Sequence, residues 1–262
     1  RTHRVRLRNL GTTDKKSSHK IRHRKIPGEH IKSREVSCMS GKYMAYVGSY
    51  SYTGKAKGIT VFDVDVENGM FKERCEIEVD NSSYVIASSD GKTLYSIADE
   101  GVVSFRILPN GSLARLNSSS IRGMRGCHLC TDEEDKYVFV SGYHDGKTTV
   151  LSLNPDGSVG KIVDGVFDRG YGSVAERNFR PHVTCTRRMP DNRFVLSVDN
   201  GIDQVKIYRF NDKEQKLVQV DAIRCDLESA PRHFRYSKDG KFIYLMYELK
   251  KAIEVYTYKT CL

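Results

Sequence analysis

The sequence predicts an all-β fold, a β-propeller built from four-stranded blades. A unit made of a polar turn and a strand recurs four times, and a second strand with alternating apolar and polar residues recurs five times. No segment shows helical periodicity of useful length. Short strands and Gly-rich turns that repeat about every 40 to 50 residues are typical of propeller blades.

The first repeated unit is a tight turn followed by an alternating strand. Where the turn contains Asp-Gly, the glycine supplies the positive φ of a hairpin, and the residues after it fill a strand. The four copies are Ser89–Tyr95, Glu134–Val140, Pro190–Leu196 and Lys238–Tyr244.

The second repeated unit is a half-buried strand, identified by its period of two residues. Its five copies start at residues 58, 102, 148, 204 and 252, which gives steps of 44, 46, 56 and 48 residues. Each step is long enough for one four-stranded blade. The longer third step predicts an insertion around residues 161–180.

Positive charge is concentrated before the repeats begin. The chain carries a formal charge of +10, and residues 1–38 hold 12 of its 43 basic residues but only three of its 33 acidic ones. Residues 39–262 are therefore close to neutral, which argues against a nucleic-acid partner. Residues 1–38 lack apolar periodicity, so we expect a disordered leader that is not native coding sequence and lies upstream of a start at Met39. A native disordered basic arm is the alternative.

The remaining composition favours a cytoplasmic protein. No run of 18 apolar residues is present, so we expect no membrane span. The seven cysteines are odd in number and widely spread, which suits reduced thiols in a cytoplasm.

Six short motifs follow one another along the chain, namely Tyr46–Tyr50, Gly126–Leu129, Arg177–His182, Ser197–Gly201, Ala230–Phe234 and Tyr247–Leu249. In their order and spacing they resemble the lactonase family of seven-bladed β-propellers, whose best-known members are bacterial 6-phosphogluconolactonases. The resemblance spans residues 44–258. Thr184 stands where the family often has a second histidine. Seven blades are implied, whereas the repeats account for about five, so we expect residues 39–262 to be a C-terminally truncated propeller domain.

The resemblance implies that a set of histidine, arginine and carboxylate side chains in the central channel carries the reaction. Opening a lactone with water requires a base and donors for the developing oxyanion, and a phosphorylated substrate also requires cations. The catalytic candidates are His128, Arg180, His182 and Arg232. The substrate-binding candidates are Arg177, His233, Asp199 and Glu248.

Structural alternatives exist for several of these residues. His128 could instead bond a neighbouring carbonyl, and Arg232-His233 could be a repeated structural corner. Asp99, Asp199 and Glu248 occupy equivalent places, so they could be carboxylates that bond backbone amides in turns.

No cofactor and no metal are expected. Cys127 and Cys130 are spaced like a zinc half-site, but their side chains point to opposite faces of a strand and no second pair exists. The two Gly-Lys-Thr segments belong to β-turns rather than to a phosphate-binding loop. No Gly-x-Ser-x-Gly nucleophile motif is present.

Taken with the resemblance, these features predict a metal-independent hydrolase of a small sugar lactone. The expected substrate is 6-phosphogluconolactone, which gives 6-phosphogluconate in the pentose phosphate pathway. The alternatives are a non-catalytic propeller that serves as a binding scaffold, and a lactonase or cycloisomerase for another lactone. An anionic substrate requires Arg180 and Arg232 to face the channel, whereas a scaffold does not.

Overall fold

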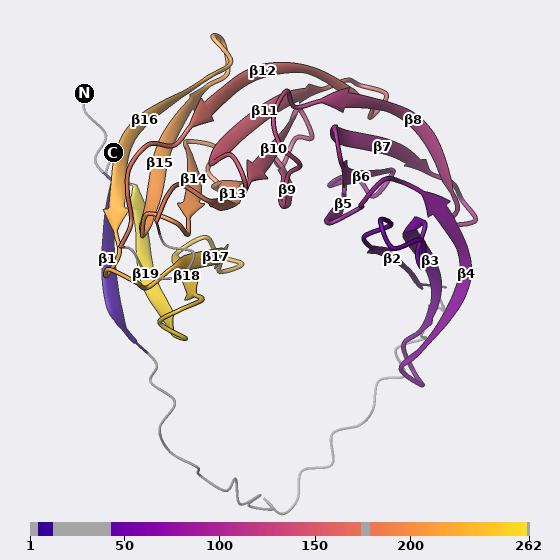
Figure 1. The fold of residues 1–262 in the computed structure, drawn as a ribbon, viewed down its shortest axis with the longest axis horizontal. Coiled ribbons are helices and arrows are strands. Elements are labelled where there is room, and N and C mark those ends of the chain that lie inside the picture. Colours follow the sequence, from indigo (N-terminus) through magenta and orange to yellow (C-terminus); the bar gives the residue numbers. More distant parts are fainter. Residues whose placement is uncertain (1–4, 13–42, 174–178, 261–262) are drawn as a thin grey trace, which may run out of the picture.

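The predicted all-β architecture is confirmed. A computed structural model describes residues 5–12, 43–173 and 179–260, and within these ranges every regular element is a β-strand. The strands form five antiparallel sheets that follow one another around an open arc (Figure 1). No helix in the described ranges is long and apolar enough to cross a membrane.

Three of the sheets are complete blades made from consecutive strands. The second sheet contains β5 (Val85–Ala87), β6 (Thr93–Ala98), β7 (Gly101–Ile107) and β8 (Leu113–Ser120). The third contains β9 (His128–Thr131), β10 (Tyr137–Gly142), β11 (Lys147–Leu153) and β12 (Val159–Phe167). The fourth contains β13 (Val183–Arg188), β14 (Phe194–Asp199), β15 (Gln204–Asn211) and β16 (Lys216–Arg224).

The first sheet has three strands, namely β2 (Tyr43–Gly48), β3 (Gly58–Asp65) and β4 (Met70–Glu78). By the sequence repeat, β3 is equivalent to β7, so β2 is equivalent to β6. Among the described residues, this sheet therefore contains no strand equivalent to β5. The free edge of β2 lies on the inner side of the arc (Figure 1).

The last sheet departs from the prediction for the leader. It contains β17 (Pro231–Tyr236), β18 (Phe242–Tyr247) and β19 (Ile253–Thr260), and its fourth strand is β1 (Val5–Thr12). β1 pairs antiparallel with β19, so this part of the leader belongs to the fold. An edge strand is held by backbone hydrogen bonds, which need no apolar pattern in the sequence. The rest of residues 1–38 lies outside the described residues.

The predicted turns take the expected conformation. Gly91 and Gly240 have φ of 68° and 69°, as an Asp-Gly hairpin requires. In the two copies without glycine, Asp135 and Asn192 adopt positive φ instead, at 50° and 56°. Asp and Asn adopt positive φ more readily than most other residues, so the turn forms without glycine in these two copies.

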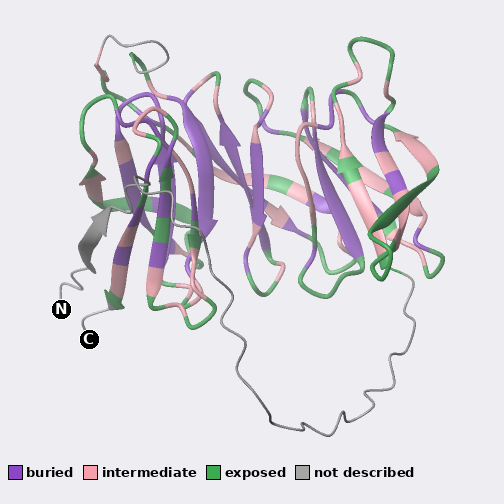
Figure 2. Cartoon of the chain, turned by 90° about the horizontal axis from the view of Figure 1, so that it is seen from below, coloured by how far each residue is buried: buried purple, intermediate pink, exposed green. Residues whose placement is uncertain are grey.

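The hydrophobic cores lie between neighbouring sheets. Ile97 and Leu129 belong to the core shared by the second and third sheets, and Phe234 belongs to the core shared by the fourth and fifth. Figure 2 shows buried residues along the strands and exposed residues mainly at the turns. This packing fixes the inner strands, which present the polar side chains described next.

Candidate functional site

The candidate site lies on the inner side of the arc, where β9, β13 and β17 run close together (Figure 1). Each of these strands pairs with only one neighbour, and its free edge lies on the inner side of the arc (Figure 1). His128 begins β9, Cys185 and Arg187 lie on β13, and His233 lies on β17.

His128 is the centre of this cluster and is only 1% exposed. Its ring packs against Tyr84 and His233, with centroids 4.8 and 5.3 Å away. Its Nε2 lies 3.2 Å from Nη2 of Arg187 and therefore accepts a hydrogen bond from the guanidinium. Nδ1 has no hydrogen-bond partner among the described residues, so the alternative of a carbonyl-bonded histidine is not what the structure contains.

The two channel histidines are held in the neutral form. Burial, followed by the charge of Arg187, lowers the pKa of His128 well below its usual range. Burial and the same guanidinium lower the pKa of His233 to about 4. Both imidazoles therefore carry an uncharged nitrogen near neutral pH, which a proton acceptor requires.

A second cluster lies at the mouth, in the loops that follow β10, β14 and β18. Arg232 donates to Oε2 of Glu248 over 3.1 Å, and its guanidinium carbon lies 5.7 Å from the centre of the Tyr143 ring. Asn200 Nδ2 also donates to Glu248, over 3.3 Å. These contacts hold Arg232 in place on the mouth of the site.

His182 joins the same cluster from the other side of Tyr143. The two rings are stacked with centroids 4.3 Å apart, and His182 Nδ1 donates to the Tyr143 carbonyl oxygen over 2.6 Å. Four predicted residues, His128, His182, Arg232 and His233, thus lie in two neighbouring clusters, together with Glu248.

Asp199 has a different position from the other candidates. It is fully buried, and its Oδ1 accepts from the backbone N–H groups of His182 and Gly201 over 2.8 and 2.9 Å. The alternative predicted for this residue, a carboxylate that bonds backbone amides, is therefore confirmed. Asp199 holds the loop that carries His182.

The equivalent residues Asp99 and Glu248 do not share this role. Asp99 accepts from the side chains of Asn81 and Arg125 instead. Arg180 is exposed, with its guanidinium carbon 5.7 Å from the Phe179 ring centre. Arg177 lies outside the described residues.

Asp199→Asn is expected to stabilise the fold above neutral pH by about 2 kcal/mol. Burial and the neighbouring Asp168 raise the pKa of Asp199 to about 8, against 3.8 for an unperturbed aspartate. The pKa of Asp199 is higher in the folded protein than in the unfolded chain. The stabilising contribution of its neutral carboxyl group is therefore fully present below about pH 4 and is lost as the pH rises through about 8. Asparagine keeps the acceptor for both amides and removes this loss.

Urea unfolding at pH 5 and pH 8.5 tests this prediction. Asp99→Asn is the matched control, because Arg125 lowers the pKa of Asp99 and the sign of the effect is reversed. An Asp199→Asn variant that is less stable than the parent at both pH values would contradict the assignment.

Several residues of the site were not predicted. Cys185 and Arg187 lie on β13 and Arg235 lies on β17, whereas Tyr84 and Tyr143 lie in loops. The available signal was the two-residue spacing of Cys185 and Arg187 on β13 and of His233 and Arg235 on β17, which places each pair on one face of its strand. The sequence analysis did not use this signal.

His128, Cys185 and His233 also form a potential metal-ligand set, with ligand atoms within 4.8 Å of one another. Imidazole and thiolate suit zinc or copper. However, Arg187 donates to the Nε2 of His128 and brings a positive charge to the same point. This arrangement of a guanidinium beside the three potential ligands favours an anion over a cation.

Cys127 is not part of this set, because its Sγ lies 3.4 Å from the carbonyl oxygen of Val183.

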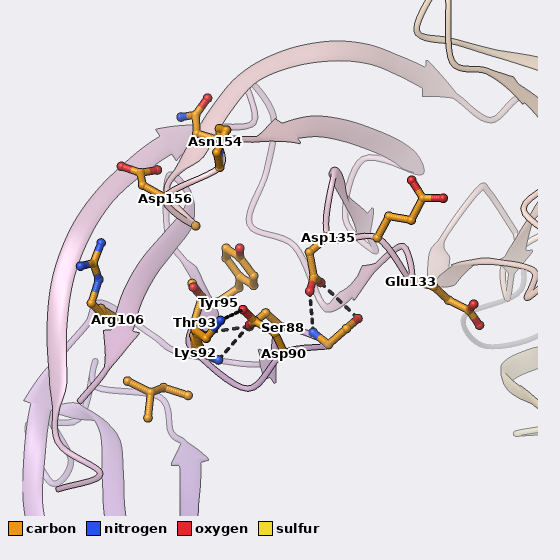
Figure 3. Close-up of a pocket in the computed structure, with 15 residues that line it drawn as sticks. Ser88, Asp90, Lys92, Thr93, Tyr95, Arg106, Glu133, Asp135, Asn154 and Asp156 are labelled. Atoms are coloured by element: carbon orange, nitrogen blue, oxygen red, sulfur yellow. Dashed lines mark hydrogen bonds and ion pairs between the residues drawn. The ribbon is translucent and has the colours of Figure 1, made fainter. Parts of the chain in front are cut away.

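A cavity of about 640 Å³ lies elsewhere (Figure 3). It is formed by turns at the opposite end of the blades from the mouth, and it is lined by charged residues such as Asp90, Lys92 and Asp135. No histidine lines it. A smaller cavity of about 240 Å³ lies beside the channel histidines and is lined by Arg187, Arg235 and Tyr84, among others.

Comparison with known proteins identifies the family. The model of the seven-bladed β-propeller lactonases matches residues 44–261. The chain belongs to this lactonase family. The resemblance of its motifs to that family is thereby confirmed.

The family relatives share moderate identity. The 6-phosphogluconolactonase of Bacillus subtilis is 31% identical over 218 residues, which cover 81% of this chain and 61% of that protein. The 6-phosphogluconolactonase of Formosa agariphila is 27% identical, with 80% and 63% covered. The chain thus spans less than two thirds of the length of these relatives.

Solved structures agree with the fold. A candidate 6-phosphogluconolactonase of Bacteroides fragilis superposes with a TM-score of 0.78 at 29% identity, covering 86% of this chain and 68% of that one. A periplasmic gluconolactonase of Pseudomonas aeruginosa has a TM-score of 0.75 at 24% identity, covering 84% and 66%. At that identity the second structure supports the propeller fold alone.

Proposed function

We propose that this lactonase hydrolyses a sugar lactone, and that its substrate is 6-phosphogluconolactone. The observation that carries the proposal is the pair of neutral histidines, His128 and His233, beside the guanidinium groups of Arg187 and Arg232. A 6-phosphogluconolactonase is also among its relatives.

The proposed reaction is the addition of water to the lactone carbonyl. In the neutral ring of His128 the acceptor nitrogen is Nε2, which accepts from Arg187, and in this proposal Nε2 takes a proton from the attacking water once that guanidinium turns to the substrate. The carbon–oxygen bond of the ring then breaks, and the ring oxygen receives that proton as it becomes a hydroxyl group. The product is an open-chain acid.

Charge develops on the carbonyl oxygen during this reaction. Arg232, fixed by Glu248, supplies donors for it at the mouth. His182 lies in a loop that Asp199 holds through the backbone N–H of His182. The exposed Arg180 lies in the same loop. In this proposal Arg232, His182 and Arg180 act on the substrate, His233 and Arg177 bind it, and Asp199 and Glu248 position the others.

The proposal includes a location in the cytoplasm and a place in the pentose phosphate pathway. The cysteines that the structure describes are all free thiols, which suits a reducing compartment.

The substrate is tested by comparing freshly generated 6-phosphogluconolactone with unphosphorylated gluconolactone. We expect hydrolysis of both above the rate in buffer, with kcat/KM at least about tenfold higher for the phosphorylated lactone because guanidinium groups bind its phosphate. A preference for the unphosphorylated lactone would overturn the substrate assignment. Folded protein without activity on either lactone would favour the binding scaffold.

A further inference from the structure

Arg187 is a buried cation without a carboxylate partner in the described structure. It is 8% exposed, and its hydrogen-bond contacts include the neutral His128 ring at 3.2 Å and the Sγ of Cys130 at 3.6 Å. Its Nε has no partner among the residues described. A buried charge that lacks a counter-ion is costly, so its presence requires an explanation.

The next residue on the same strand shows what a structural arginine looks like here. Arg188 is equally buried, but it forms ion pairs with Asp132 at 3.4 Å and Asp212 at 2.9 Å. Successive residues of a strand point to opposite faces, so Arg187 is turned away from both carboxylates. The fold thus pairs one of two adjacent arginines and leaves the other on the channel side.

Arg187 borders the cavity of about 240 Å³ beside the channel histidines. Arg235 lies two residues after His233 on β17 and lines the same cavity, as do the phenol groups of Tyr84 and Tyr236. The two acidic residues in the lining do not neutralise Arg187. Asp132 accepts from Arg188 and from backbone N–H groups, and Glu133 is exposed at the rim.

We propose that this cavity is an anion-binding subsite, in which Arg187 and Arg235 bind a phosphate group carried by the substrate. Two guanidinium groups and two phenols offer more donors than a carboxylate can accept, and a tetrahedral oxyanion matches that number better. Because Arg187 contacts His128, a phosphate bound there places the attached sugar beside the proposed base. The identity of the sugar rests on the proposed function, whereas the anion site does not.

Inorganic phosphate is the probe for this subsite. Thermal unfolding of the chain is followed while sodium phosphate replaces sodium chloride at constant ionic strength. We expect a saturable rise in Tm, because a ligand that binds only the folded state stabilises it. Arg187→Met is expected to weaken apparent phosphate affinity at least about tenfold, as the loss of a charge-assisted contact implies.

The same variant separates an anion site from a structural arginine. Without phosphate, Arg187→Met is expected to be at least as stable as the parent, because it removes an unpaired buried charge. Arg235→Met provides a second test if Arg187→Met fails to fold. Arg209→Met, at an exposed position of β15, is the control and keeps the parental phosphate response.

A parent protein with no phosphate-dependent change in Tm would overturn the proposal, and so would Arg187→Met and Arg235→Met variants that respond like the parent. The phosphate response does not depend on catalysis. Phosphate binding at Arg187 without lactone hydrolysis would support the subsite and refute the proposed function. Lactone hydrolysis without phosphate binding at Arg187 would support the proposed function and refute the subsite.

Discussion

His128→Ala is expected to reduce kcat for lactone hydrolysis by a factor of roughly 100 to 1,000, the range for loss of a general base. His128 is the most buried histidine of the channel cluster, and its Nε2, the acceptor nitrogen of the neutral ring, is the proposed proton acceptor. KM should change little, because the proposal assigns phosphate binding to Arg187 and Arg235. Steady-state assays corrected for spontaneous ring opening measure both constants.

Two further variants sharpen this test. His128→Gln retains an acceptor for Arg187 but cannot take a proton at neutral pH, so it should fold and remain inactive. His144→Ala changes an exposed histidine on the loop after β10 and should keep kcat within about twofold. Parental kcat in His128→Gln would refute the role of His128 as the base.

Gly201→Ala is expected to lower the free energy of unfolding by roughly 3 kcal/mol, at the upper end of the cost of overpacking. A Cβ at this position would overlap the backbone carbonyl oxygen of Arg180 and lie 2.8 Å from Cδ2 of His182. The carbonyl belongs to the backbone, so the loop that carries Arg180 and His182 must move. Activity should therefore fall together with stability.

Urea unfolding of Gly201→Ala and Gly91→Ala measures the effect of this close approach. Gly91 has a φ of 68° but no atom within 4 Å of a Cβ, so its replacement costs only backbone strain of about 1 kcal/mol. Equal losses of stability in the two variants would show that the contact with Arg180 is not important.

The strands of the blades could be predicted because they alternate between a packed face and a less buried one, a pattern that is local in the sequence. β1 could not be predicted in this way. It joins the last sheet by pairing its backbone with β19, more than 240 positions away, and its alternation of apolar and basic residues covers only Val5–Arg8. The leader was therefore predicted to be disordered from its composition, which carries no information on the pairing of edge strands.

Within the site, residues that belong to the recognised motifs were easier to predict than the other residues of the inner strands. His128, His182, Arg232 and His233 were recognised from motifs, and the structure brings them to two adjacent clusters. Arg187 and Arg188 are indistinguishable in the sequence, and only the register of β13 shows that one faces Asp132 and the other His128. Asp99 and Asp199 likewise follow similar turns, but their partners come from distant segments.

The most direct test of the proposed activity is the release of 6-phosphogluconate from freshly generated 6-phosphogluconolactone. The chain is first shown to be folded by its β-type circular dichroism and a cooperative unfolding transition. We predict release well above the rate in buffer, proportional to protein concentration and lost in His128→Gln. Folded protein that leaves the rate of ring opening unchanged would contradict the proposal that this lactonase acts on 6-phosphogluconolactone.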